Sequence, residues 1–306
     1  MSSKIQIFIL SLKNSDRIDR LKKRLKILNI DYKILLGIDG NRKINHKKLK
    51  KIYNQKKTTS FISRELAFPE IAASYAHLMA YEIIVKKKIS SAIIMEDDVY
   101  PSKIISHWVK NNIKINDNYI LSFYVYPGLG FIYKKPEIEN ILGTSKNKIN
   151  IHNAKTHLLN GSCYQINFKT CKNILRITNG KVCGFVDWPI NLQNSKINLG
   201  VTLPYLNTFI KNKSNTANAR EEMTSNIFGF KHKLPIFIQD ILKTFYYLSL
   251  TPYFLRRYSN FNFYYEYFFF KYLQLIKNIF ISKYYNTEKI YNNVKFYSSD
   301  IKNKIN

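Results

Sequence analysis

Acidic residues are scarce in this chain. Of its 306 residues, 20 are Asp or Glu and 49 are Lys or Arg, which gives a formal net charge of +29. Such an excess attracts anions: nucleic acids, acidic lipid headgroups or sugar nucleotides. The chain is also rich in Lys, Asn, Ile, Tyr and Phe, which AT-rich codons encode, so the charge alone does not specify the partner.

Cysteine and long apolar runs are scarce as well. The three cysteines, Cys163, Cys171 and Cys183, are odd in number and fit no zinc spacing, so we expect a reducing cytoplasm and no disulfide framework. No uncharged segment is long enough to span a bilayer, and the apolar run at 5–12 is too short for a signal peptide. The hydrophobic content of 45% is ample for a folded core.

The first forty residues predict a strand, a helix and a second strand. Residues 5–12 are apolar enough for a buried strand, and Ile18, Leu21, Leu25 and Leu28 follow at helical spacing. Asp16 is a candidate N-cap, with Asp19 placed to close a capping box. Residues 32–36 form the second strand and 37–40 a turn. This order predicts a βαβ unit and a parallel sheet.

The rest of the chain extends the α/β pattern. We expect a loop at 41–60, helices at 69–88 and 168–177, and further strands at 91–95, 119–126, 161–167 and 197–203. Alanines at 72, 73, 76 and 80 would let the helix at 69–88 pack closely on a sheet. The prediction is a mostly parallel sheet flanked by helices over residues 1–230. Residues 231–306, crowded with Tyr, Phe, Lys and Arg, form a separate helical extension.

Three of the few acids stand together directly after the expected strand at 91–95. They are Glu96, Asp97 and Asp98. The carboxyl ends of parallel strands are where open α/β sheets bind ligands, and hard oxygen ligands suit Mg²⁺ or Mn²⁺ bound to phosphates. We expect Asp98 to be a direct metal ligand and Glu96 a second one, with Asp97 directed to a bound nucleotide. The alternative is a capped, solvated turn without a metal.

Several of these pieces, in this order, resemble glycosyltransferase family 25, which contains bacterial lipooligosaccharide galactosyltransferases and animal collagen galactosyltransferases. The matching pieces are the first strand with Arg17 and Arg20, the turn 38–40, the segment 70–78 with His77, the acids 96–98, the strand 161–166 and the segment 186–189. The resemblance covers residues 5–206. It departs from the family pattern at Ala76, where the family has Ser before the His.

The resemblance implies a GT-A-like, Rossmann-type sheet that binds a nucleotide-sugar donor at its carboxyl edge. It also implies a UDP-hexose donor, with galactose as the sugar, a divalent cation, and transfer with inversion. The acceptor it implies is a lipid-linked oligosaccharide of lipooligosaccharide or LPS.

Each remaining candidate residue has a functional and a structural interpretation. Arg17 and Arg20, near a helix N-terminus, suit the donor phosphates, or are surface charges. Asp39 suits the ribose or base, or forms the Asp-Gly turn. Asp187, between Val186 and Trp188, is the candidate general base, or it caps a helix at Pro189.

His77 lies on a helix that is apolar nearly all round, so we expect it to be buried and hydrogen-bonded. The resemblance adds a role in the donor or acceptor site.

The aromatic, basic extension at 231–306 suits the surface of an anionic membrane, or packs on the main domain. We therefore expect a cytoplasmic enzyme, peripheral on the inner membrane. Two alternatives stay open: a basic nucleic-acid-binding protein, although no nucleic-acid-binding motif is present, and an inactive glycosyltransferase-like protein.

Overall fold

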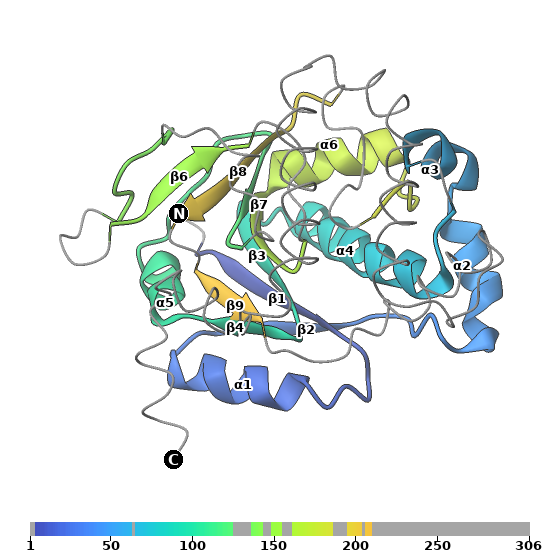
Figure 1. Ribbon diagram of the computed structural model, residues 1–306, viewed down its shortest axis with the longest axis horizontal. Helices are drawn as coiled ribbons and strands as arrows, with labels where there is room; N and C mark the ends of the chain where they lie inside the picture. The colour runs from blue at the N-terminus through green and yellow to red at the C-terminus, as the bar shows by residue number, and fades with distance from the viewer. Residues whose placement is uncertain are drawn as a thin grey trace, which may run out of the picture. The chain divides into compact units, whose positions relative to one another are not determined.

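A seven-stranded sheet forms the centre of the computed structural model (Figure 1). The structure describes residues 4–62, 65–124, 136–142, 148–154, 161–185, 195–203 and 206–209. The strand order is β2-β1-β3-β7-β5-β8-β6. The strands are β1 Gln6–Ser11, β2 Lys33–Leu36, β3 Ser91–Glu96, β5 Tyr119–Ser122, β6 Asn150–Asn153, β7 Cys163–Asn167 and β8 Asn198–Leu203.

The βαβ unit predicted at the N-terminus is present. β1 and β2 are parallel, and α1 (Ile18–Ile27) connects them. The predicted capping box is wrong: Arg17 occupies the N-cap position and makes no side-chain cap bond. The side chain of Arg17 is instead paired with acidic residues that follow β3, so this position serves the tertiary structure.

The sheet is mixed. β2, β1, β3, β5 and β8 run in one direction, whereas β7 runs against β3 and β5, and β6 runs against β8. The prediction of a mostly parallel sheet agrees with the common direction of five strands, and β7 and β6 are the two exceptions. Apolar runs of similar length occur in both orientations, so strand periodicity carries no information on direction.

Helices cover both faces of the sheet. Successive side chains of β1 point to opposite faces, so they pack against different helices. Phe8 and Leu10 pack in one hydrophobic cluster with α4 (Phe68–Lys86) and α6 (Phe168–Thr178). Ile7 and Ile9 pack in a second cluster with α1 and α5 (Lys103–Lys110). Ala72, Ala76 and Ala80 of α4 lie in the first cluster, as predicted, whereas Ala73 is only partly buried and lies outside it.

The segment expected as a loop at 41–60 is mostly helical, so that prediction is wrong. It forms η1 (Lys43–Asn45), α2 (His46–Ile52) and α3 (Gln55–Ile62). Only Leu49 of α2 is buried, and it joins the cluster around α4. One buried apolar residue gives almost no helical periodicity in the sequence, so the helix could not be predicted from the apolar pattern. Two main-chain bonds of 2.9 Å, Asn54 N–H to Val182 O and Val182 N–H to Ile52 O, also fix the segment.

A separate two-stranded sheet lies next to the acidic residues. Its first strand follows them directly, and its second comes from the end of the described residues. β4 (Val99–Pro101) pairs antiparallel with β9 (Asn207–Phe209). Arg24 of α1 holds β4 in place: its Nε donates to Pro101 O at 2.9 Å, and its guanidinium lies 4.7 Å from the centre of the Tyr100 ring. The chain after the acids is therefore attached to α1.

Cys163, Cys171 and Cys183 are buried and unpaired. Within the described ranges, no helix has the length and apolar character needed to cross a bilayer. The predicted extension at 231–306 lies outside the described residues, so its boundary and its helical character stay predictions.

Candidate active site

The carboxyl ends of β1 and β3 lie side by side, and this places Ser11 next to the acidic turn. Leu10 is the register partner of Glu96, so the residues that follow, Ser11 and Asp97, are neighbours. Ser11 Oγ donates to Asp97 Oδ2 at 2.7 Å, and both side chains are buried. The link fixes the first acid after β3 to the end of β1.

Arg17 bridges two of the acids. Its Nη2 lies 2.8 Å from Asp97 Oδ1 and its Nη1 lies 3.4 Å from Asp98 Oδ2. Both oxygens of Asp97 are thus engaged, one by Ser11 and one by Arg17. In this arrangement Asp97 anchors the guanidinium, and its predicted contact with a bound nucleotide stays a prediction.

Asp98 keeps one oxygen without a partner. Asp98 Oδ1 is buried and accepts no hydrogen bond, although nearly all buried polar atoms in proteins are paired. Burial and the nearby charge of Glu96 raise the pKa of Asp98 to about 7, against the opposing effect of Arg17. A carboxyl group in this state would be stabilised by an additional positive charge.

Glu96 faces a different group of side chains. Its Oε1 lies 3.4 Å from Nε2 of His77, and its side chain is about one third exposed, at 32%. Burial and the charge of Asp97 raise the pKa of Glu96 to about 7. Glu96 and Asp98 thus resist ionisation together, which is typical of carboxylates gathered for a purpose other than stability.

His77 is buried and hydrogen-bonded, as its helix predicted. Its Nδ1 lies 2.7 Å from the hydroxyl of Tyr164, and burial lowers the pKa of His77 to about 3. The imidazole is therefore neutral at physiological pH. It contacts the site through Glu96, so α4 contributes to the acidic turn from the opposite face of the sheet to α1.

These features all fall within one sequence match. A family model described as glycosyltransferase family 25 (LPS biosynthesis protein) matches residues 4–183, which is more than half of the chain. The chain belongs to glycosyltransferase family 25. No curated protein matches it. Membership supports a glycosyltransferase of LPS biosynthesis, and the α/β sheet fits the Rossmann-like core expected of such an enzyme.

The acids of this family 25 protein fit a divalent cation only in part. Among the residues that the structure describes, no three His, Cys, Asp or Glu side chains are grouped to hold a metal. Mg²⁺, however, commonly uses one or two carboxylates and takes its other ligands from phosphates and water. Asp98, with its unpaired oxygen, and the nearby Glu96 fit that arrangement.

The other predicted site residues are placed differently. Arg20 is exposed on α1, and within the described ranges it is Arg17, not Arg20, that forms ion pairs with the acids. Asp39 forms a turn, because its Oδ1 accepts from Asn41 N–H at 2.9 Å and its carbonyl accepts from the Asn45 amide at 2.8 Å. Asp187 lies outside the described residues, so its role as general base stays a prediction.

Glu70 is the first residue of the segment 70–78 that resembles the family pattern. Its carboxylate accepts a hydrogen bond from Ala67 N–H at 3.0 Å at the start of α4. It therefore has a clear structural role as a cap.

Sequence reasoning missed three residues of this region: Ser11, Tyr81 and Tyr164. Ser11 ends a strand and resembles any polar turn residue. Tyr81 follows His77 by four residues on α4, a spacing that places two side chains on one helix face, so this signal was available. Tyr164 lies in the strand that matched the family pattern, but no role had been given to it.

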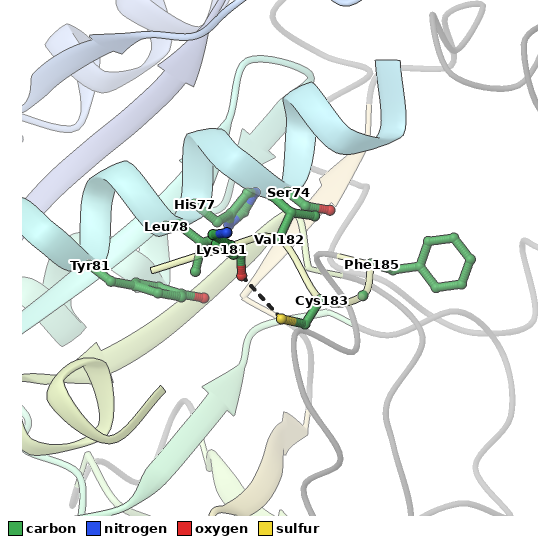
Figure 2. A pocket seen from close by; sticks show the side chains of 9 residues that line it. Ser74, His77, Leu78, Tyr81, Lys181, Val182, Cys183 and Phe185 are labelled. Carbon is green, nitrogen blue, oxygen red and sulfur yellow. Dashed lines mark hydrogen bonds between the residues drawn. The ribbon is translucent and has the colours of Figure 1, made fainter. Parts of the chain in front are cut away.

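A small cavity adjoins His77 and Tyr81 (Figure 2). The residues that line it are Ser74, His77, Leu78 and Tyr81 of α4 together with Lys181, Val182, Cys183, Gly184 and Phe185. The thiol of Cys183 donates to Lys181 O at 3.4 Å at its edge. Its volume of about 10 Å³ is close to what one water needs, so it is too small for a sugar.

Proposed function

We propose that this protein transfers a hexose, galactose, from a UDP-sugar to a lipid-linked oligosaccharide of LPS, in one inverting displacement assisted by Mn²⁺ or Mg²⁺. The observation that carries the proposal is the buried, unpaired Oδ1 of Asp98 beside Glu96 at the carboxyl edge of the sheet. Family membership supports the transferase and the LPS pathway.

Asp98 and Glu96 would hold the cation through their carboxylate oxygens. When bound, the cation neutralises charge on the departing diphosphate, which is the main electrostatic need of this reaction. Arg17 stands at the N-terminus of α1 and carries a second positive charge to the same edge. Its guanidinium and the helix dipole both suit a phosphate group.

Asp187 is the proposed general base. In an inverting transfer the acceptor hydroxyl attacks the anomeric carbon, the bond from that carbon to the UDP oxygen breaks, and the hydroxyl proton passes to the base. No covalent enzyme intermediate is needed. Asp187 is flanked in the sequence by the apolar Val186 and Trp188, and a carboxylate suits this role when apolar surroundings bury it in part.

We place the reaction at the cytoplasmic face of the inner membrane, where a lipid-linked acceptor would be presented. The support is compositional: residues 231–306 interleave Tyr and Phe with Lys and Arg, which favours the interface of an anionic membrane.

The test is to incubate the protein with a panel of UDP-sugars, with and without Mn²⁺, and to measure the UDP released. We expect release from one sugar, dependent on the cation. Asp98→Ala should abolish it while the circular dichroism spectrum stays unchanged. Asp117→Ala is the matched control, since Asp117 is exposed and paired with Lys169.

Three results would contradict the proposal. These are turnover without a cation, unchanged turnover in Asp98→Ala, or no release from any UDP-sugar. The last result combined with salt-sensitive binding of an oligonucleotide would favour the nucleic-acid alternative. No release without such binding would favour an inactive protein.

A further inference from the structure

Three buried side chains form a continuous hydrogen-bonded chain that ends at Glu96. The hydroxyls of Tyr81 and Tyr164 are 2.6 Å apart, the Tyr164 hydroxyl is 2.7 Å from His77 Nδ1, and His77 Nε2 is 3.4 Å from Glu96 Oε1. Tyr81 and His77 come from α4, Tyr164 from β7 and Glu96 from the end of β3. Figure 2 shows His77 and Tyr81 on one face of α4.

The direction of the hydrogen bonds follows by elimination. In the carboxylate form, which is the form that would hold a cation, Glu96 can only accept, so His77 must donate from Nε2. A neutral imidazole has one N–H, which leaves Nδ1 as an acceptor for the hydroxyl of Tyr164. Tyr164 then has no proton left for Tyr81, so Tyr81 donates to the oxygen of Tyr164. All the bonds point toward Glu96.

The hydrogen-bonded side chains do not support the backbone. Within the described ranges, none of the three side chains bonds to a backbone group, so they cap no helix and complete no sheet edge. Apolar residues of similar shape at such positions are often neutral or favourable for stability. A buried polar set of this kind is therefore better explained by a role in the candidate site than by a contribution to stability.

We propose that Tyr81, Tyr164 and His77 are positioning residues that hold Glu96 by one oxygen and leave the rest of its carboxylate for the cation and the donor. This inference rests on the proposed function, because it assumes that Glu96 faces a bound cation. Tyr164 fixes the tautomer of His77, and His77 presents its N–H to Glu96. Such outer partners commonly change metal affinity by ten- to a hundredfold.

A matched pair of substitutions at His77 separates positioning from packing. His77→Gln places an amide nitrogen about where the imidazole carries Nε2, so it can still donate to Glu96. His77→Asn reaches only as far as Nδ1, so it keeps a polar group near Tyr164 but loses Glu96. Both variants keep a buried amide, and a merely structural role would affect them alike.

The first measurement is Mn²⁺ binding to the full-length protein without any donor, by electron paramagnetic resonance. We expect affinity to fall roughly ten- to a hundredfold in His77→Asn and to stay within about threefold of wild type in His77→Gln. Equal losses in the two variants, or no loss in either, would overturn the inference.

The second measurement does not depend on the cation. In the metal-free protein labelled with ¹⁵N-histidine, kept at about pH 8.5 so that Glu96 is a carboxylate, the resonance that disappears in His77→Asn identifies His77. We expect the neutral Nε2–H tautomer in wild type and in Tyr81→Phe, and loss of that preference in Tyr164→Phe. An Nδ1–H tautomer in wild type would reverse the hydrogen bonds and sink the proposal. If wild type binds no Mn²⁺ but shows the Nε2–H tautomer, the result contradicts the proposed cation of the main reaction and still supports the hydrogen-bonded arrangement of Tyr81, Tyr164 and His77.

Discussion

Arg17 and Asp97 form an ion pair of 2.8 Å between Nη2 and Oδ1, and both side chains are largely withdrawn from water. A buried charge whose partner is removed is costly, so each residue depends on the other. Arg17 also contacts Asp98, the proposed metal ligand. Stability and function are therefore linked at this position, and the predictions below separate them.

Arg17→Ala should destabilise the fold by about 3 kcal/mol, because it leaves Asp97 buried without its cation. Arg20→Ala is the matched control three residues along the same helix. Arg20 is exposed, so its loss should cost less than about 0.5 kcal/mol. Urea unfolding followed by circular dichroism measures both. Equal costs would show that the ion pair contributes no stability.

Ser11→Ala should cost about 1–3 kcal/mol, because Asp97 Oδ2 loses the 2.7 Å hydrogen bond that it accepts in a buried site. Ser60→Ala is the control, since Ser60 is exposed on α3 and its loss should change little. The same unfolding experiment applies. A Ser11→Ala variant as stable as wild type would mean that water replaces the hydroxyl.

The acids predict a stability that depends on pH and on the cation. The folded-state pKa values of Glu96 and Asp98 are raised to about 7 from 4.5 and 3.8, so ionising them opposes folding. Their contribution is most favourable below pH 4 and is lost as pH rises to about 7. Mn²⁺ should therefore raise the melting temperature more at pH 8 than at pH 5. At a hundredfold excess of Mn²⁺ over its Kd, binding adds about 2.7 kcal/mol to the free energy of unfolding.

His77 contributes in the opposite sense. Its pKa is lowered from 6.5 to about 3, so the stability that it supplies is lost as pH falls below 6.5. The quantity to compare is therefore the difference between wild type and Asp98→Asn in a thermal melt at each pH. A difference that does not change between pH 4 and 8 would contradict the raised pKa of Asp98.

Gly40→Ala should be strongly destabilising. A Cβ at residue 40 would lie 2.5 Å from Phe68 O and from Pro69 Cα, which are main-chain atoms at the start of α4. Gly37→Ala is the control three residues earlier, since the nearest atom to its Cβ would be Ala76 Cβ at 3.6 Å, an ordinary contact. Thermal melts of the two variants give the comparison. Similar melting temperatures would mean that α4 can shift to admit the methyl group.

The early part of the fold was predictable because its signals are local. The apolar run of β1, the helical stripe of α1 and the acids after β3 each lie in a continuous segment. The same locality explains the failures. The helices at 43–62 have few buried residues, so they follow no apolar period, and their support comes from the distant Val182.

The candidate site was predictable to the extent that it follows parallel strands. Glu96 ends β3, and Asp97 and Asp98 come directly after it, as that rule expects. Tyr164 does not obey it. β7 runs against its neighbours, so its beginning, and not its end, lies at the functional edge. Arg17 and Arg20 show a further limit, because sequence spacing could not tell which of two arginines turns toward the acids.

α1 grips the acidic turn at two places. Arg17 holds Asp97 and Asp98, and Arg24, two helical turns further on, holds Pro101 and the ring of Tyr100. The segment 97–101 is thus held at both of its ends by side chains of the same helix. Little conformational entropy is therefore left to lose on binding, so folding has already set the carboxylate spacing that the proposed cation and nucleotide would have to match.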